Sequence, residues 1–157
     1  ISTSAVLSVV LQQATSLGGD AFFLYHHAAD GRTIGLNATG HAPDGATPEY
    51  YKDGIPDRGP NAVSVPGMVR GWERLHQKYG KRPWTELFDD AIDAAEAHPA
   101  SRVLCAGLDL FRDAVFADPA SRALYFNDAG ERMQAGDIMR PNGSTRCRPA
   151  IAATTCR

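Results

Sequence analysis

The segment 62–80 constrains the fold of this chain more than any other stretch. It opens with a strand-like run, Ala62–Val65, which must end at Pro66 because proline cannot donate a ladder hydrogen bond. Apolar and aromatic residues then recur at spacings of three and four, and Gly80 follows as a natural helix stop. The residues of this stripe are Val69, Trp72, His76 and Tyr79. The sequence therefore predicts a strand end, a sharp turn and a helix in immediate succession.

An antiparallel hairpin is predicted upstream of this segment. Ala21–His26 is rich in aromatic residues and bounded by glycines and a turn, which is typical of a buried strand. The Ala-Asp-Gly sequence at 29–31 favours a hairpin turn, because glycine reaches positive φ without steric cost. Arg32–Asn37 should return as the partner strand, with Ile34 and Leu36 on one face.

Helical periodicity dominates the rest of the chain. Pro83 suits the first position of a helix, and Ser101 is a residue type that caps helices. The predicted helices are 5–11, 69–79, 83–95, 102–115 and 119–125. The long connection 38–61, rich in Gly, Pro, Asp and Thr, is of the kind that wraps a surface or builds a site.

The balance of charges excludes some classes of function. The chain has 16 basic and 18 acidic residues and a net charge of −2, whereas nucleic-acid binding needs a concentrated basic field. No apolar run approaches the ~18–20 residues that cross a bilayer. The Gly-Gly-Asp sequence at 18–20 precedes a strand rather than a helix, unlike a phosphate-binding loop. We therefore expect no nucleic acid, membrane or nucleotide partner.

The three cysteines match no metal-site template. Cys105 lies on a predicted helix face with Leu104 and Leu108, which favours a buried free thiol. A disulfide between Cys147 and Cys156 remains open, and so do the redox compartment and the location of the protein. We expect no metal and no cofactor.

Four of the five histidines fit structural positions. His26 and His27 are adjacent on a strand, so their side chains point to opposite faces and do not readily share one metal ion. His76 lies on the helical stripe, and His98 follows a helix, where a cation favours the helix dipole. His41 differs, because it lies inside the long connection, in the run Asn-Ala-Thr-Gly-His-Ala-Pro at 37–43.

The order and spacing of several short motifs resemble the early part of the large subunit of gamma-glutamyltransferases. The resemblance runs from about Leu17 to Arg140. Its motifs are Gly-Gly-Asp-Ala-Phe-Phe-Leu at 18–24, Leu-Asn at 36–37, Ala-Pro at 42–43, Ala-Thr-Pro at 46–48, Val-Pro-Gly at 65–67, Ala-Ile at 91–92, Ala-Ala-Glu at 94–96, Pro99, Ser101, Gly130 and Gly-Asp at 136–137.

The resemblance implies an α+β fold: part of the N-terminal-nucleophile hydrolase (αββα) architecture, here a hairpin with three or four helices. Members of the family transfer or hydrolyse gamma-glutamyl amides, with glutathione as the usual donor, after a precursor has cleaved itself into two subunits. The expected partners are therefore the small subunit, or the remainder of the same precursor, and a small-molecule gamma-glutamyl amide. The attacking threonine of the family begins the small subunit, so we expect no catalytic residue in this chain and no activity from the chain alone.

The resemblance also points to candidate substrate-binding residues, Thr39 and His41. In the family, the neighbourhood just before Ala-Pro carries an arginine that holds the substrate's α-carboxylate, a task that suits a planar, permanently charged guanidinium. This chain has no arginine between Arg32 and Arg58. His41 is therefore either a ligand that acts when protonated or an ordinary loop residue.

The sequence predicts a partial large-subunit domain at 1–140 and an atypical, poorly ordered tail at 141–157. The tail has three arginines, two cysteines and no acidic residue. Its Thr154-Thr155 pair resembles the threonines that begin the family's small subunit, but we interpret it as an incidental Thr-Thr in the tail. A truncated or frame-disrupted coding region would explain the change after Arg140. The alternative to an enzyme segment is a non-catalytic module: a degenerate fragment, or one that binds a partner through an uncovered face.

Overall fold

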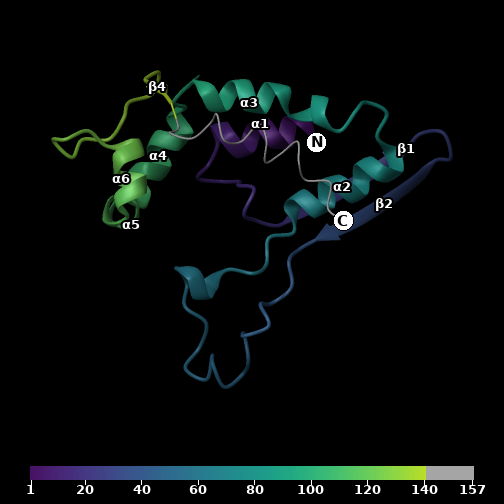
Figure 1. Cartoon of the computed structure of the whole chain (residues 1–157), viewed down its shortest axis with the longest axis horizontal. Coiled ribbons are helices and arrows are strands. Elements are labelled where there is room, and N and C mark those ends of the chain that lie inside the picture. The colour runs from purple at the N-terminus through teal and green to yellow at the C-terminus, as the bar shows by residue number, and fades with distance from the viewer. Residues whose placement is uncertain (141–157) are drawn as a thin grey trace. The chain divides into compact units, whose positions relative to one another are not determined.

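The computed structural model describes residues 1–140. The predictions for 141–157, including the Thr-Thr pair and the Cys147–Cys156 disulfide, fall outside the described residues. The chain divides into two compact units, one of residues 17–81 and one of residues 1–16 with those from Arg82 onward. In chain order the elements are α1 (Ser2–Val10), β1 (Ala21–His27), β2 (Arg32–Ala38), the 3-10 turn η1 (Pro60–Ala62), α2 (Met68–Tyr79), the 3-10 turn η2 (Thr85–Phe88), α3 (Asp89–Glu96), β3 (His98–Pro99), α4 (Arg102–Leu110), α5 (Arg112–Ala117), α6 (Pro119–Tyr125) and β4 (Ile138–Met139) (Figure 1).

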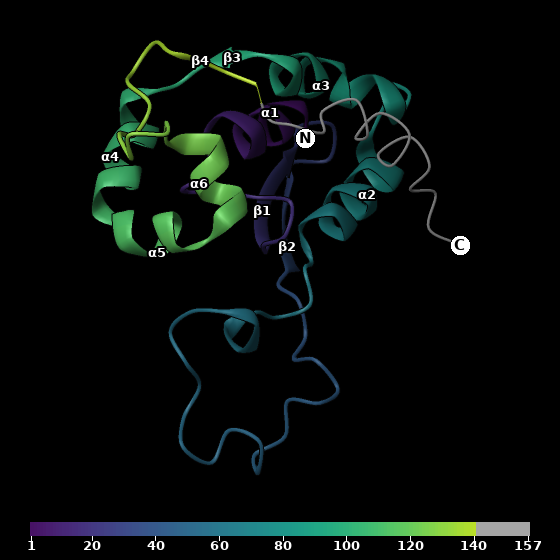
Figure 2. The same ribbon diagram turned by 60° about the vertical axis from the view of Figure 1, so that its left-hand side comes forward.

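The unit 17–81 is built on the predicted hairpin. Strands β1 and β2 pair antiparallel from Ala21 opposite Ala38 to His27 opposite Arg32. The turn has Gly31 at a φ of 66°, as the Ala-Asp-Gly sequence predicts. Helix α2 lies along the hairpin in both ribbon views (Figures 1 and 2).

Gly71 explains how closely helix and hairpin pack. A Cβ atom on Gly71 would lie 2.4 Å from the Ala38 Cβ and 2.9 Å from the Phe23 ring. Both distances are below normal contact, so a larger residue would force α2 away from the sheet. The inward-facing side chains of β1 and β2 therefore have a helix against them.

The prediction that β1 is a buried strand is wrong for one of its faces. The side chains of β1 alternate between the two faces of the hairpin. Phe22 and Leu24 lie on the face opposite α2 and are 75% and 83% exposed. Aromatic content marked the strand correctly, but burial depends on a second layer that the described residues do not supply.

The predicted strand at 62–65 is also wrong. Residues 60–62 form the turn η1, and the backbone then runs without a strand to Pro66. The Val65 N–H donates to the His41 carbonyl at 3.0 Å, but no ladder develops from this bond. Strand-like composition was not sufficient, because proline ends the possible pairing after one bond.

The other unit has two helical clusters. Helices α1 and α3 lie side by side, and α4, α5 and α6 gather around a second core (Figures 1 and 2). Ser101 caps α4 as predicted, since its hydroxyl accepts the Leu104 N–H at 3.0 Å. The buried residues of this core are Ala100, Leu104, Cys105, Leu108 and Met139. Cys105 is the buried free thiol that the sequence predicts.

Two predicted helices are interrupted. The stripe at 83–95 divides into η2 and α3, and the helix at 102–115 breaks at Phe111, whose ψ of 22° lies outside the helical range. Apolar periodicity continues across both breaks, which is why the sequence does not show them. Helix α6 has the bounds that were predicted, with Pro119 at its first turn and the Asp118 carboxylate accepting the Ser121 N–H at 2.7 Å.

An acid-sensitive ion pair joins α4 to the loop that leads toward β4. Arg132 donates two parallel hydrogen bonds to the Asp109 carboxylate, at 2.5 and 2.7 Å, and they lower the pKa of Asp109 below its usual 3.8. A carboxyl group with a lowered folded-state pKa stabilises the fold above its unfolded-state pKa and loses that contribution as the pH falls through the folded value. We expect Asp109→Asn to lower the midpoint of urea unfolding at pH 7, and the difference from wild type to shrink as the pH falls below 3.8.

The control for this prediction is Asp53→Asn, which removes an exposed carboxylate from the long connection. Its unfolding midpoint should follow wild type at both pH values. Because the pair is exposed, 1 M salt should shrink the effect of Asp109→Asn. A wild-type and Asp109→Asn difference that persists at low pH would contradict the assignment.

Candidate functional site

The candidate site lies where β2 ends. Ala38 is the last residue of β2, and the chain then passes Thr39 and His41, both exposed, on its way into the long connection. The His41 carbonyl accepts the Val65 N–H at 3.0 Å, so the two ends of the connection lie against each other. The first turn of α2 begins three residues after Val65.

Two glycines allow this close approach. A Cβ atom on Gly40 would lie 1.4 Å from the Val65 carbonyl oxygen, and one on Gly67 would lie 2.2 Å from the Ala38 carbonyl oxygen. In both cases the obstacle is backbone, which cannot rotate away as a side chain can. Glycine is thus required at both positions for the observed geometry.

The Asp20 carboxylate forms hydrogen bonds with both ends of the long connection. It accepts the Gly40 N–H at 2.7 Å and the Ser64 hydroxyl at 3.4 Å. The neighbouring Gly19 carbonyl accepts the N–H groups of Gly67 and Met68 at 3.2 and 3.0 Å. The Gly-Gly-Asp motif at 18–20 therefore organises backbone.

A groove of about 630 Å³ opens between the end of β2 and the start of α2. Thr39 and His41, the two predicted site residues, both line it. Thr39 is oriented by its neighbour, since its hydroxyl donates to the Asn37 side-chain oxygen at 2.6 Å and its N–H donates to the same atom at 2.8 Å. The structure thus brings the two predicted residues to one groove.

Sequence reasoning missed two lining residues, Arg70 and Arg74 on α2. Their spacing of four places them on one face of the helix. This spacing of the two arginines is visible in the sequence, but the prediction of this helix rested only on its apolar stripe. Arg70 pairs with Glu73 at 2.6 Å.

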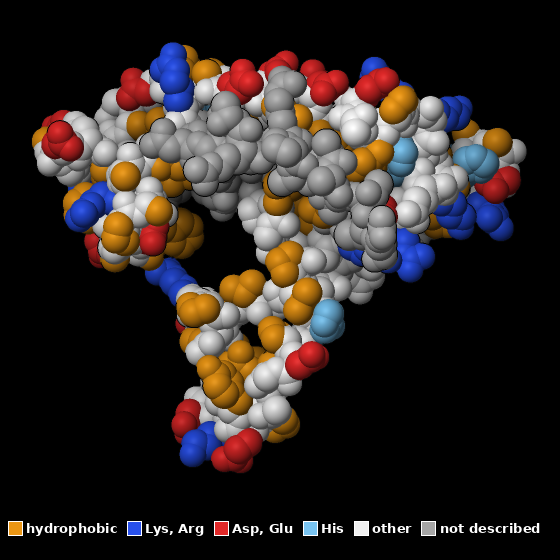
Figure 3. Space-filling view, in the orientation of Figure 1, with side chains coloured by type: hydrophobic (Ala, Val, Ile, Leu, Met, Phe, Trp, Pro, Cys, Tyr) orange, Lys and Arg blue, Asp and Glu red, His pale blue; other side chains and the backbone are white. Residues whose placement is uncertain are grey.

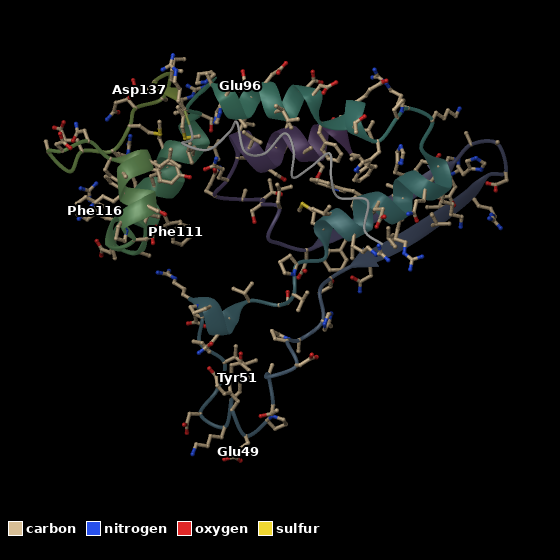
Figure 4. All side chains as sticks on the ribbon, viewed as in Figure 1. Glu49, Tyr51, Glu96, Phe111, Phe116 and Asp137 are labelled. Carbon is tan, nitrogen blue, oxygen red and sulfur yellow. The ribbon has the colours of Figure 1, made fainter. Side chains whose placement is uncertain are left out.

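A larger groove, about 880 Å³, lies in the other unit beside α6 and the loop after it. Its two arginines already have partners: Arg132 holds Asp109, and Arg112 donates to the Gly130 carbonyl at 2.6 Å. Arg112 also lies over the rings of Phe116 and Phe126. Figure 4 labels Phe116 at helix α5. These groups serve local packing, so the smaller groove is the better candidate.

The other histidines have local partners within their own units. His27 Nδ1 lies 2.9 Å from the Asp30 carboxylate, and this hydrogen bond lowers the pKa of Asp30. His26 Nδ1 lies 3.0 Å from the Thr33 hydroxyl. His98 donates from Nδ1 to the Ala94 carbonyl at 2.8 Å, because a carbonyl can only accept.

Residues 1–140 contain neither a metal-binding cluster nor a membrane-spanning helix. Within that range no three His, Cys, Asp or Glu side chains gather closely enough to hold a metal ion. No helix in the described part of the chain has the length and apolar character to cross a membrane.

Comparison with solved structures defines the class of protein. The chain is similar to Helicobacter pylori gamma-glutamyltranspeptidase, with a TM-score of 0.85 and 26% sequence identity over 96% of this chain and 45% of that chain. It is similar to a cephalosporin acylase from Bacillus halodurans, with a TM-score of 0.81 and 27% identity over 96% of this chain and 30% of that chain. The fold is therefore a partial α+β fold of the N-terminal-nucleophile hydrolase class, as predicted.

Sequence comparison then gives the family. The glutathione hydrolase-like YwrD proenzyme of Bacillus subtilis is 34% identical over 109 residues, which cover 67% of this chain and 21% of that protein. The gamma-glutamyltranspeptidase family model matches residues 1–155. This chain belongs to the gamma-glutamyltranspeptidase family and corresponds to an N-terminal part of the large subunit. It spans about a fifth of the length of the Bacillus subtilis relative.

Proposed function

We propose that this chain is the scaffold and substrate-binding part of an enzyme that transfers or hydrolyses gamma-glutamyl or related amides. The attacking N-terminal threonine is supplied by a small subunit or by the remainder of the same precursor. Family membership supports the reaction class, and relatives named as proenzymes support processing from a precursor. The similarity to a cephalosporin acylase supports the wider range of amides.

The observation that carries the proposal is the groove at the end of β2. Thr39 and His41 line it just before the Ala-Pro pair, on a backbone held by Asp20 and by two obligatory glycines. A rigid backbone is what a substrate-binding loop needs, because a misplacement of about 1 Å can cost 10²-fold in rate. Thr39 offers a hydroxyl, and His41 offers an imidazole that donates from both nitrogens when protonated.

The exposed face of the hairpin supports a protein partner. Phe22 and Leu24 present two large apolar side chains on neighbouring positions of that face. Burial of such side chains is worth roughly 1.5–3 kcal/mol each. We assign this face to the remainder of the precursor. The same face would also serve the alternative function, that of a non-catalytic module that binds an unrelated partner.

The test compares the 157-residue chain with the complete precursor that the gene encodes. We expect the precursor to release the chromogenic amine from a gamma-glutamyl anilide, and the chain alone to release none. Replacing the threonine that becomes the N-terminus of the small subunit with alanine should abolish release of the amine. A precursor that folds and is processed but has no such turnover would favour the non-catalytic module.

His41 gives a sharper prediction within the active precursor. His41→Arg places a permanently charged, planar donor at the groove in place of an imidazole. We expect the KM for the anilide to fall by about tenfold, the effect of one added charge-assisted hydrogen bond, with kcat little changed. The control His76→Arg, on α2 but outside the groove lining, should leave KM unchanged. An unchanged KM in His41→Arg would remove His41 from the substrate site.

A further inference from the structure

One face of α2 is turned toward the groove. The groove is lined by Gly67, Arg70, Gly71 and Arg74, which are spaced at three and four residues. The two glycines bring the backbone close to β2, and the two arginines stand beside them at intervals of about one helical turn. This face of α2 therefore packs closely against β2 and also carries positive charge.

The charge of the groove has one sign. Two guanidinium groups line it, and no Asp or Glu is among the lining residues. Arg70 forms an ion pair with Glu73, which also accepts a hydrogen bond from Gln77 at 3.2 Å. Arg74 is exposed, and among residues 1–140 no hydrogen bond or ion pair holds it. Arg74 is therefore the donor in this groove that is ready for a ligand.

We propose that Arg74, assisted by Arg70, binds a carboxylate of the substrate in the groove between β2 and α2. In this chain the guanidinium for the substrate anion then comes from helix α2 and not from the Thr39–His41 segment. This proposal rests on the proposed function for the identity of the substrate, a gamma-glutamyl amide, whose α-carboxylate is the anion. It names the substrate-binding residue that the sequence before Ala-Pro does not contain.

The physical argument is one of matching shape and charge. A guanidinium presents parallel N–H groups that fit the two oxygens of a carboxylate, and such pairs are stronger than neutral hydrogen bonds. Arg74 has no competing anion in the described chain, so binding breaks no existing pair. Thr39 and His41 line the same groove and can add hydrogen bonds to the same anion.

The test uses the 157-residue chain and two probes. One probe is a gamma-glutamyl anilide with a free α-carboxylate, and the other is the same compound with an α-carboxamide. Binding is followed by NMR through the Nε–Hε signals of the arginine side chains. We expect the carboxylate probe to shift the Arg74 signal in a saturable way, and Arg74→Gln to weaken binding by about tenfold. The carboxamide probe should bind to wild type as weakly as the carboxylate probe binds to Arg74→Gln.

The matched control is Arg82→Gln, which removes an exposed arginine outside the groove lining and should leave affinity unchanged. Arg74→Lys keeps the charge but loses the fork and should bind with intermediate affinity. Equal binding of both probes, unchanged affinity in Arg74→Gln, or no saturable binding to wild type would each overturn the proposal.

Kinetics in the complete precursor separate this proposal from the proposed function. We expect Arg74→Gln to raise KM by about tenfold and to leave kcat nearly unchanged, because the carboxylate is remote from the reacting amide. Turnover by the precursor with an unchanged KM in Arg74→Gln would refute the role of Arg74 alone. Carboxylate binding that depends on Arg74 in a precursor without turnover would refute the proposed function alone.

Discussion

Gly40→Ala is expected to disrupt the unit 17–81 more severely than most single-methyl additions would. The new Cβ atom would lie 1.4 Å from the Val65 carbonyl oxygen, well inside any permissible contact. The conflict is one of space and not of φ, and both backbones are tethered: Gly40 to Asp20, and Val65 to His41. Overpacking of this kind costs typically 1–3 kcal/mol or more. We expect a loss at the upper end of that range, together with the loss of groove binding.

Hydrogen exchange measures this effect locally. The N–H groups of Gly40 and Val65 are hydrogen-bonded in the wild type, and both amides at these positions should lose protection in Gly40→Ala. The control is Gly45→Ala, a glycine of the same connection with open space around it. That substitution should be neutral or stabilise by up to about 1 kcal/mol, because alanine restricts the unfolded chain. Equal behaviour of the two variants would contradict the packing of the two segments.

Leu104→Ala is the second change with a large expected effect. Leu104 is 1% exposed at the centre of the core beneath α4. Truncation there removes buried methyl groups and leaves a cavity, so we expect a loss of about 2–5 kcal/mol in the free energy of unfolding.

The same helix provides the control for this second prediction. Leu110, 75% exposed on α4, carries the same side chain without the burial, and Leu110→Ala should change stability by no more than about 0.5 kcal/mol. Urea unfolding of both variants gives the comparison. A small loss in Leu104→Ala, or similar losses in both, would show that α4 does not cover the core described here.

Local chemistry in the sequence predicted much of this fold. The Asp-Gly turn, the Ser101 cap and the Pro119 helix start each act within four residues, and each was found where expected. Failures arose where the outcome depends on distant parts of the chain. Within residues 1–140, the segment 62–65 has strand composition but pairs with no strand, and Phe22 lies in a strand whose outer face is not covered.

The candidate site was predictable in part for the same reason. Thr39 and His41 were proposed from the motif that they precede, and both line the groove. Arg70 and Arg74 belong to another element, and only the approach of α2 to β2 brings them to the same groove. That approach depends on the close packing of Gly71 against Ala38 and Phe23. These residues are far apart in the sequence, so composition and periodicity do not reveal the contact.

The long connection itself was predictable from the sequence, but a contact within it was not. Its composition, rich in Gly, Pro, Asp and Thr, predicted a long connection, and residues 42–59 contain neither helix nor strand. Figure 3 shows hydrophobic side chains gathered on this projecting segment, and Tyr50 and Ile55 are exposed there. Within it, Tyr51 bridges the two arms by donating to the Asn61 carbonyl at 2.7 Å (Figure 4). The sequence predicts such a loop readily, but not the contact that closes it.

One measurement tests the central claim most directly: that this chain holds the substrate while another segment supplies the nucleophile. A labelled sample of the 157-residue chain is titrated with gamma-glutamyl anilide while free amine is recorded in the same tube. We expect saturable shifts of the Thr39 and His41 backbone signals, with no amine above the protein-free blank. Amine released by the chain itself, or a titration that leaves both signals unmoved, would contradict the account.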